Sequence, residues 1–185
     1  MVEKKEKQNI QNYPRVEIDF SPKIPPLKLI KDKTKINLRY TLISPFAFAH
    51  LYWDEKISEV VYDVEEPALN ETEKNQKEQI ISAMRDIIDF DIVIEGGEEK
   101  ILDYIDKKFK LLAIELGIDL SYESYRKIYY YLCRDFIGFN EIEPLLRDYF
   151  IEDIECNGVE SSVYIVHRRY INMKTNIVFK NPEYL

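Results

Sequence analysis

Arginine, histidine and acidic side chains gather near the end of this 185-residue chain. The stretch SVYIVHRRY places His167, Arg168 and Arg169 in a row, and an earlier run, IEDIECNG, places Glu152 beside Asp153. A guanidinium presents a planar fork of N–H donors that matches the oxygens of a phosphate group. A histidine with two carboxylates has instead the residue types of acid–base catalysis. The backbone that carries these residues decides between the two chemistries.

Both runs have the composition of β-strands, and the Asn-Gly pair at 157–158 favours a chain reversal between them. Successive side chains of a strand point to opposite faces, so Glu152 and Asp153 are separated and do not form an acid–base pair. By the same alternation, only one of Arg168 and Arg169 can point at a given ligand. A hydrolase that uses Glu152, Asp153 and His167 is therefore the weakest interpretation.

The composition excludes several classes of protein. With 34 acidic and 26 basic residues the net charge is −8, which argues against general affinity for nucleic acid or anionic membranes. The chain has no apolar run of about 18 residues, and its charged start has no secretory signal, so we expect a cytoplasmic protein. Cys133 and Cys156 lack CxxC spacing, which favours reduced thiols over a disulfide. With two histidines and no clustered cysteines, we expect no metal site.

The order of sequence patterns predicts the organisation of the chain. We expect a flexible N-terminal tail over residues 1–20, an N-terminal α/β part over 21–97, a helical part over 98–150 and a C-terminal β-hairpin region over 151–185. The predicted fold is α/β or α+β. It has a mixed sheet from the N-terminal strands, two to three helices in the middle and the start of a small C-terminal sheet.

The middle of the chain has the periodicity of helices. Asn70, followed by Glu73, has the form of an N-cap with a carboxylate that reaches back, and apolar residues at helical spacing continue to about residue 89. The next run, DFDIVIEGG, predicts a short strand or an extended linker. Two more helices are expected from their start and stop signals, which are Glu98, Gly117, Ser121 and Gly138.

Charge is distributed unevenly along the chain. The segment from Lys23 to Arg39 carries six basic residues and one acid, whereas Asp54 to Glu123 carries 20 acids and 8 bases. A solvated loop and an edge strand protected by lysines would explain the basic segment. The alternative is a docking surface for an acidic partner or a neighbouring copy.

The C-terminal motifs resemble the N-terminal region of archaeal secretion-system ATPases, the hexameric motors of type II and type IV secretion, pilus assembly and the archaellum. A further segment, VVYDVEEPALNETE, is similar to an upstream element of that family. The residues that match the family pattern are Arg134, Asp135, Gly138, Glu143, Pro144, Leu145, Ile151, Glu152, Asp153, Ile154, Asn157, Gly158, Val163, Tyr164, His167, Arg168, Thr175, Asn176 and Ile177. The pattern often has Pro before the second strand and Gly after the Tyr, where this chain has Ser162 and Ile171.

A phosphate-binding loop requires the pattern Gly-x-x-x-x-Gly-Lys-Ser/Thr. The chain has five glycines, and none is followed by lysine, so by itself it is not expected to be an ATPase. The resemblance implies the N-terminal part of such an enzyme, with ATP and Mg²⁺ held elsewhere in the full-length protein.

The resemblance also implies roles for single residues. In that family, arginines of the N-terminal domain reach the phosphates of a nucleotide in the cleft beside the P-loop domain. Arg168 is the first candidate here and Arg169 the second. We expect a structural role for His167, a turn at Asn157, and capping, bridging or subunit contacts for Glu152 and Asp153.

The partners implied are the protein's own P-loop motor domain, further copies in a homo-hexamer and a polytopic membrane platform protein at the cytoplasmic face. Nucleic acid is not expected. The alternative is a free-standing scaffolding or regulatory domain that binds an acidic protein partner and no nucleotide.

Overall fold

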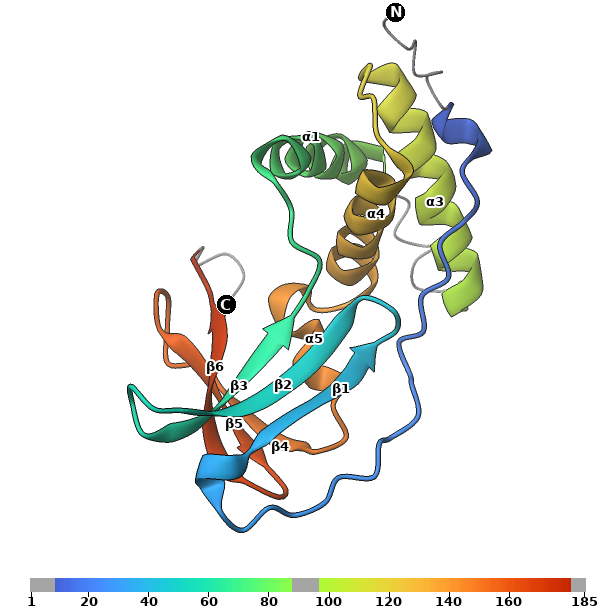
Figure 1. Ribbon diagram of the computed structural model, residues 1–185. Coiled ribbons are helices and arrows are strands. Elements are labelled where there is room, and N and C mark those ends of the chain that lie inside the picture. Colours follow the sequence, from blue (N-terminus) through green and yellow to red (C-terminus); the bar gives the residue numbers. More distant parts are fainter. Residues whose placement is uncertain (1–8, 88–96, 181–185) are drawn as a thin grey trace, which may run out of the picture. The chain divides into compact units, whose positions relative to one another are not determined.

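The computed structural model describes residues 9–87 and 97–180. The fold is α+β, with a curled mixed sheet and, among the described residues, four helices, which confirms the predicted fold class (Figure 1). The chain forms two compact units. The helical unit comprises Met1–Glu17 and Ala68–Gly138, and the sheet unit comprises Ile18–Pro67 and Phe139–Leu185. Each unit is therefore built from two separate stretches of sequence.

The sheet unit has one six-stranded sheet in the order β1-β2-β3-β6-β5-β4. Its strands are β1 (Asn37–Ile43), β2 (Ala47–Asp54), β3 (Glu59–Glu65), β4 (Ile151–Glu155), β5 (Ser162–His167) and β6 (Ile171–Val178). All neighbours are antiparallel except β3 and β6, which are parallel. The expected N-terminal and C-terminal groups of strands thus share one sheet.

The junction between β3 and β6 depends on one side chain as well as on backbone pairing. Val61 lies opposite Lys174 and Tyr62 opposite Thr175. Beyond this short ladder, the Asn176 amide accepts a hydrogen bond from the Val64 N–H and donates one to the Val64 carbonyl, both at 2.9 Å. The side chain continues the strand pairing where the two backbones no longer meet.

Alternation along the strands decides which face of the sheet is buried. Ala47, Ala49 and Leu51 are fully buried, whereas the side chains between them are only half-buried. Strand β2 is therefore buried on one face. His50, on the other face, lies with its ring nitrogens 3.1 Å from Glu65 Oε1 and 2.9 Å from Asn37 Oδ1.

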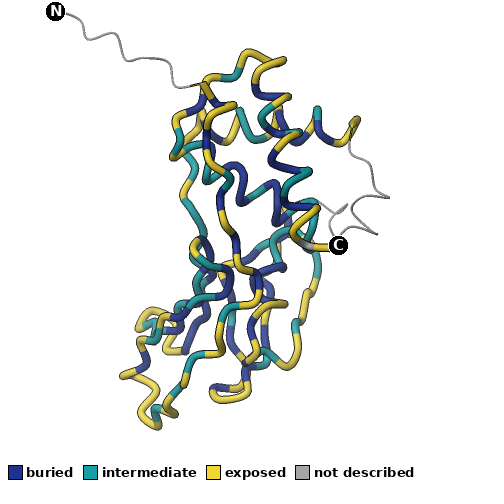
Figure 2. The backbone as a smooth tube through the Cα atoms, turned by 90° about the vertical axis from the view of Figure 1, so that its right-hand side faces the viewer, coloured by how far each residue is buried: buried dark blue, intermediate teal, exposed yellow. Residues whose placement is uncertain are grey.

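Both edges of the sheet are polar. Strand β1 follows the basic segment, in which no residue from 21 to 35 is buried (Figure 2). A single 3-10 turn, η2 (Lys33–Lys35), precedes the strand. Strand β4 forms the other edge and is irregular between Ile151 and Asp153. Exposed charges and an irregular strand both discourage pairing with another chain at an edge.

The helical unit contains α1 (Glu71–Ile87), α3 (Glu98–Glu115) and α4 (Tyr122–Ile137). These ranges confirm the three helices expected from periodicity. The apolar residues Ile101, Leu102, Ile105, Phe109 and Leu112 of α3 are buried, whereas Leu116, which is the C-cap residue, is exposed. Gly117 has φ +65, as expected of a left-handed stop.

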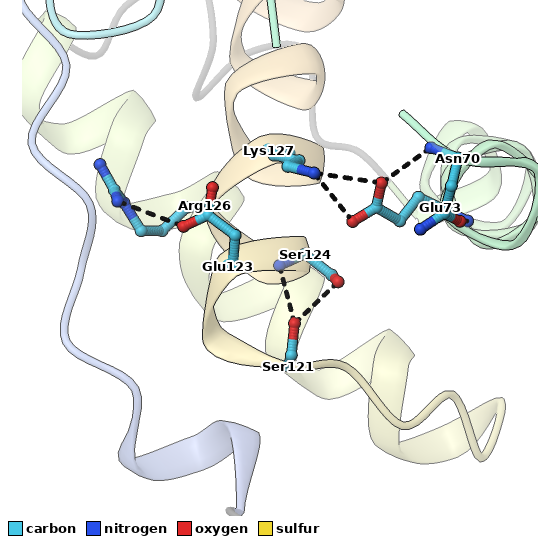
Figure 3. Close-up of polar contacts among 7 residues, drawn as sticks. All are labelled: Asn70, Glu73, Ser121, Glu123, Ser124, Arg126 and Lys127. Atoms are coloured by element: carbon cyan, nitrogen blue, oxygen red, sulfur yellow. Dashed lines mark hydrogen bonds and ion pairs between the residues drawn. The ribbon is translucent and has the colours of Figure 1, made fainter. Parts of the chain in front are cut away.

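Two predicted caps are present. The Asn70 N–H donates to Glu73 Oε2 and the Glu73 N–H donates to Asn70 Oδ1, each at 2.9 Å, so the two residues form a reciprocal capping box. Glu73 also lies 3.3 Å from Nζ of Lys127 on α4 (Figure 3). Ser121 accepts a hydrogen bond from the Ser124 N–H. One carboxylate thus starts α1 and ties it to α4.

The tail over residues 1–20 was expected to be flexible, but its described part up to Glu17 packs in the helical unit. Ile10, Tyr13 and Val16 are buried. The Tyr13 hydroxyl donates to the Leu120 carbonyl at 2.8 Å, and Lys110 donates to the Tyr13 carbonyl at 2.8 Å. These three apolar residues are spaced three positions apart, so they lie on one face of the segment and are buried together. The polar residues around them made this pattern hard to recognise in the sequence.

The sheet unit also holds the short helix α5 (Glu143–Leu146), with a 3-10 turn, η3 (Asn140–Ile142), before it. Pro144 occupies the first turn, where its missing N–H costs no helical hydrogen bond. The strand or linker predicted over DFDIVIEGG falls almost entirely outside the described residues. Over the ranges 9–87 and 97–180, no helix combines the length and the apolar character needed to cross a bilayer.

Candidate phosphate-contacting turn

The two arginines lie in the turn that joins β5 to β6. Strand β5 was predicted to run through Tyr170, but it ends at His167. The Tyr170 N–H donates to the His167 carbonyl at 3.2 Å, and Ile171 takes φ +66, so the chain reverses here. Strand alternation therefore does not apply to Arg168 and Arg169, and it does not force them to opposite faces.

The turn is anchored through its backbone. The Arg168 N–H donates to the Phe150 carbonyl at 2.8 Å, and the Arg169 N–H donates to Nδ1 of His167 at 3.1 Å. The Tyr170 hydroxyl donates to the Lys28 carbonyl at 3.1 Å. These bonds position the main chain and leave both guanidinium groups outside.

His167 fills the space beneath the turn. Its side chain is 1% exposed, and its ring stacks on Phe150 with centroids 5.6 Å apart. Burial lowers the pKa of His167 to about 4, the Arg169 charge acts in the same direction, and Asp148 partly opposes both. The ring is neutral at ordinary pH and accepts the Arg169 N–H, which is the structural role expected for it.

A buried carboxylate lies behind the same turn. Asp148 Oδ2 accepts hydrogen bonds from Tyr40 and Tyr62 at 2.5 and 2.7 Å, and Oδ1 accepts the Phe150 N–H at 2.8 Å. Burial, followed by the Asp148 charge, raises the pKa of both tyrosines, which stay protonated as donors. The buried acid is saturated by hydroxyl and amide donors, so it does not neutralise the arginines.

The Arg168 side chain contacts neighbouring residues but remains exposed to solvent. Its guanidinium carbon lies 4.3 Å from the centroid of the Tyr149 ring, a cation–π contact. Its Nε is 3.7 Å from Glu152 Oε1, and both side chains are more than two-fifths exposed. A contact this long between solvated groups is a weak ion pair. A ligand with higher charge can displace Glu152 at small cost.

Arg169 is exposed, and no carboxylate of the described chain forms an ion pair with it. The positive charge of Arg169 disfavours the charged form of neighbouring His167 and so contributes to its lowered pKa. Two cations, one loosely paired and one unpaired, thus follow each other on an anchored turn.

The supporting residues predicted from sequence do not all meet at this turn. Glu152 and Asp153 are exposed on β4. The Asp153 carboxylate accepts a hydrogen bond from the N–H of the next residue, Ile154. Asn157 is exposed in the loop after β4, where Gly158 takes φ +118. Of these three residues, Glu152 contacts an arginine of the turn, and within the described part of the chain Asp153 and Asn157 do not.

Several other motif residues have internal structural roles. Thr175 donates to the Val163 carbonyl at 2.8 Å. Buried Glu143 accepts the Phe139 N–H at 2.9 Å and pairs with Arg147. Sequence reasoning missed Tyr149 and Asp148, because a tyrosine and an aspartate in the segment RDYF have no motif that marks a platform or a buried acceptor.

The described residues offer no obvious metal site, since no three His, Cys, Asp or Glu side chains among them are grouped to hold an ion. Cys133 is buried and Cys156 exposed, and both are free thiols. The groups at the turn that could meet an anion are therefore the guanidinium groups themselves.

No family model matches the chain. It is 35% identical over 127 residues to the uncharacterized protein MJ1288 of Methanocaldococcus jannaschii, covering 67% of this chain and 49% of that protein. It is 31% identical over 87 residues to the uncharacterized protein MJ0900 of the same organism, covering 47% of this chain and 14% of that protein. The chain thus spans about half the length of the first relative and a small part of the second.

Proposed function

We propose that this chain acts as the non-catalytic N-terminal domain of a hexameric secretion or pilus-assembly ATPase. In this proposal, the turn after β5 supplies Arg168, and secondarily Arg169, to the phosphates of ATP. The ATP and its Mg²⁺ are held by a P-loop motor domain. The observation that carries the proposal is an anchored turn with two outward guanidinium groups that no buried carboxylate neutralises.

The physical basis is the charge that develops during phosphoryl transfer. Negative charge spreads over the oxygens of the transferred group, and a guanidinium that is already positioned stabilises it without reorganisation. Tyr149 limits the freedom of Arg168, and the Phe150 carbonyl fixes its backbone. A side chain with fewer accessible conformations loses less entropy when it meets the phosphate.

The remaining surfaces suit protein partners. The exposed basic segment from Lys23 to Arg39 is a docking surface for a neighbouring subunit or for a polytopic platform protein at the cytoplasmic face of the membrane. Contact between copies would bring this positive segment against the acidic middle of another chain.

A scaffolding domain that binds an acidic partner and no nucleotide is the second candidate. The observation that favours it is the same basic segment, of which no residue from 21 to 35 is buried. Under this alternative, changes at Arg168 and Arg169 leave partner binding intact, while reversal of the charges at Lys28 and Lys31 abolishes it.

The test uses the full-length protein of this proposal, in which the chain is joined to its own P-loop motor domain. Arg168→Ala is expected to lower ATP turnover at least about 100-fold, because a phosphate-contacting arginine is worth about 10³ or more in related chemistry. Arg169→Ala is expected to lower it less. Arg168→Lys retains the charge but loses the fork of donors, so it restores only part of the rate.

Arg126→Ala is the matched control. Arg126 is also an arginine in a long contact with a glutamate, 3.5 Å from Glu123, but it lies on α4 of the helical unit. The Arg126→Ala variant should leave ATP turnover unchanged. Full turnover in the Arg168→Ala, Arg169→Ala double variant would reject the proposal.

A further inference from the structure

A groove with a volume of about 450 Å³ opens on the sheet unit. Its lining comes from five separate elements: η2, the end of β2, the start of β3, β5 and the first half of β6 with the turn before it. The residues that line it are Lys33, Trp53, Ser58, Glu59, Val60, Tyr164, Tyr170, Asn172 and Lys174. Its volume falls in the range of small-molecule sites, which is about 300–1,000 Å³. Arg168 and Arg169 do not line it, although Tyr170 of the same turn does.

The sheet holds the central part of this lining in place. Tyr164 on β5 is directly opposite Lys174 on β6, and Val166 is opposite Asn172. Trp53 on β2 is opposite Val60 on β3. The neighbours of Lys174 in sequence, Met173 and Thr175, are buried, so Lys174 points to the other face of the sheet. The groove therefore has a preformed floor of paired strands.

Two ammonium groups in the groove have no counter-ion. Neither Lys33 nor Lys174 forms an ion pair or a side-chain hydrogen bond with any residue of the described chain. Lys35, one turn from Lys33, is by contrast paired with Asp32 at 3.1 Å. Glu59 is the one carboxylate of the lining, so the groove is positive in a chain of net charge −8. Unpaired lysines of this kind attract an anion.

The rest of the lining suits a flat ring. Trp53 and Tyr164 offer partly exposed aromatic side chains, and Asn172 offers an exposed amide with one acceptor and two donors. The Tyr170 hydroxyl is already engaged with the backbone at residues 28 and 30, so this ring is fixed in the wall. Nucleobases stack on such rings, and amides bond to their polar edges.

From these features we propose that the groove binds a nucleoside phosphate. The base stacks on Trp53 or Tyr164, the Asn172 amide meets its edge, and the phosphate lies between Lys33 and Lys174. Ring and charge must be present in one molecule, because the lining divides into an aromatic part and a cationic part. Binding needs only the sheet unit's own residues and no motor domain, so it does not depend on the function proposed above.

Tryptophan fluorescence measures binding at this site directly, because Trp53 is the single tryptophan of the chain. Titration of the purified chain with AMP, GMP, CMP and UMP should give saturable quenching of Trp53 fluorescence with at least one of them. The matching nucleoside and inorganic phosphate, each titrated alone, should bind at least about tenfold more weakly. Titration calorimetry of Trp53→Phe should still show binding, since phenylalanine retains a stacking surface.

Substitutions of the two lysines test where the phosphate group binds in the groove. Lys33→Ala and Lys174→Ala should each weaken binding about tenfold, as the loss of one charge-assisted contact predicts. Lys35→Ala, next to the groove but outside its lining, should leave affinity unchanged. Circular dichroism and the urea midpoint of each variant show whether it is folded.

Three outcomes would overturn the proposal. These are the absence of saturable binding by any of the four nucleotides, equal binding by phosphate alone, and unchanged affinity in both lysine variants. Failure here would leave the arginine turn untouched, because that test reads turnover in the full-length protein.

Discussion

The helical unit and the sheet unit use their charged residues in different ways. In the helical unit, buried Glu73 and Asp106 are each paired with a lysine, Lys127 at 3.3 Å and Lys110 at 2.8 Å. In the sheet unit, buried Asp148 is satisfied by tyrosine hydroxyls and an amide. Three cations of its surface, Lys33, Lys174 and Arg169, by contrast form no ion pair with the described residues, although Arg147 does pair with buried Glu143.

This difference separates structural charges from charges available to a ligand. A lysine that neutralises a buried carboxylate cannot leave it without a large desolvation cost. Lys33, Lys174 and Arg169 can bind a ligand without that desolvation cost, because none of them forms an ion pair with the described residues. The comparison therefore associates the buried acids of both units with stability and leaves the unpaired cations of the sheet unit as the candidates for ligand binding.

Removal of Asp148 should have the largest effect on stability. Asp148→Ala leaves two buried tyrosine hydroxyls and the Phe150 N–H without an acceptor, which should lower the free energy of unfolding by about 3 kcal/mol. Urea denaturation measures it. Asp153→Ala, an exposed aspartate of the same unit, should change it by less than about 0.5 kcal/mol. Equal small effects would show that Asp148 is not a structural acceptor.

Glu73 should rank second and should bring a dependence on pH. Burial alone would raise the pKa of Glu73, but bonds from the Asn70 N–H, Ser124 and Lys127 outweigh it and lower the pKa. Glu73→Ala removes the capping box and the link to α4, which should cost about 2 kcal/mol. Urea denaturation again provides the measurement.

The sign of the pH effect follows from the lowered pKa. The stabilisation by Glu73 is fully present above the unfolded-state pKa of about 4.3 and is lost as pH falls through the lower folded-state value. Glu73→Gln should flatten this acid dependence. Glu71→Gln, at an exposed position of the same helical turn, should not. An unchanged acid profile in Glu73→Gln would contradict the structural role.

The junction between β3 and β6 should be the next most sensitive point. Asn176→Ala removes both side-chain bonds to Val64, which should cost about 1–2 kcal/mol. The local readout is hydrogen exchange at the Val64 amide, which should accelerate more than the amides of β2. If Val64 exchange is unaffected, the side chain does not extend the sheet.

Substitution of a cation that has no ion pair should have the smallest effect on stability. At this point the two units should differ most clearly. Arg169→Ala, Lys33→Ala and Lys174→Ala should each change the free energy of unfolding by less than about 0.5 kcal/mol. Lys110→Ala, which leaves a buried carboxylate unpaired, should cost about 3 kcal/mol. Similar losses in all four would remove the distinction between the units.

Local signals predicted the helices well. The Asn70 and Glu73 pair, Ser121 and Gly117 each form the cap or stop that their residue types favour, because those bonds span only a few residues. The pairing of β3 with β6 joins residues more than a hundred positions apart, and no short pattern encodes it.

The candidate sites were predicted only in part. The arginines were identified by motif, but the turn that carries them has no Gly or Asn, and Ile171 takes a φ that β-branched residues seldom adopt. Sequence patterns therefore extended the strand too far. The groove could not be foreseen, because its lining comes from several strands and a loop that only the folded sheet brings together.

The proposed function requires physical contact between the turn and the phosphates of ATP. A photoreactive ATP analogue modified at the γ-phosphate, added to the full-length protein in which this chain is joined to the P-loop motor domain, tests that contact most directly. After cross-linking and proteolysis, mass spectrometry should find label on residues 167–170, and excess ATP should compete it away. Label confined to the motor domain, with none on this turn, would contradict the account.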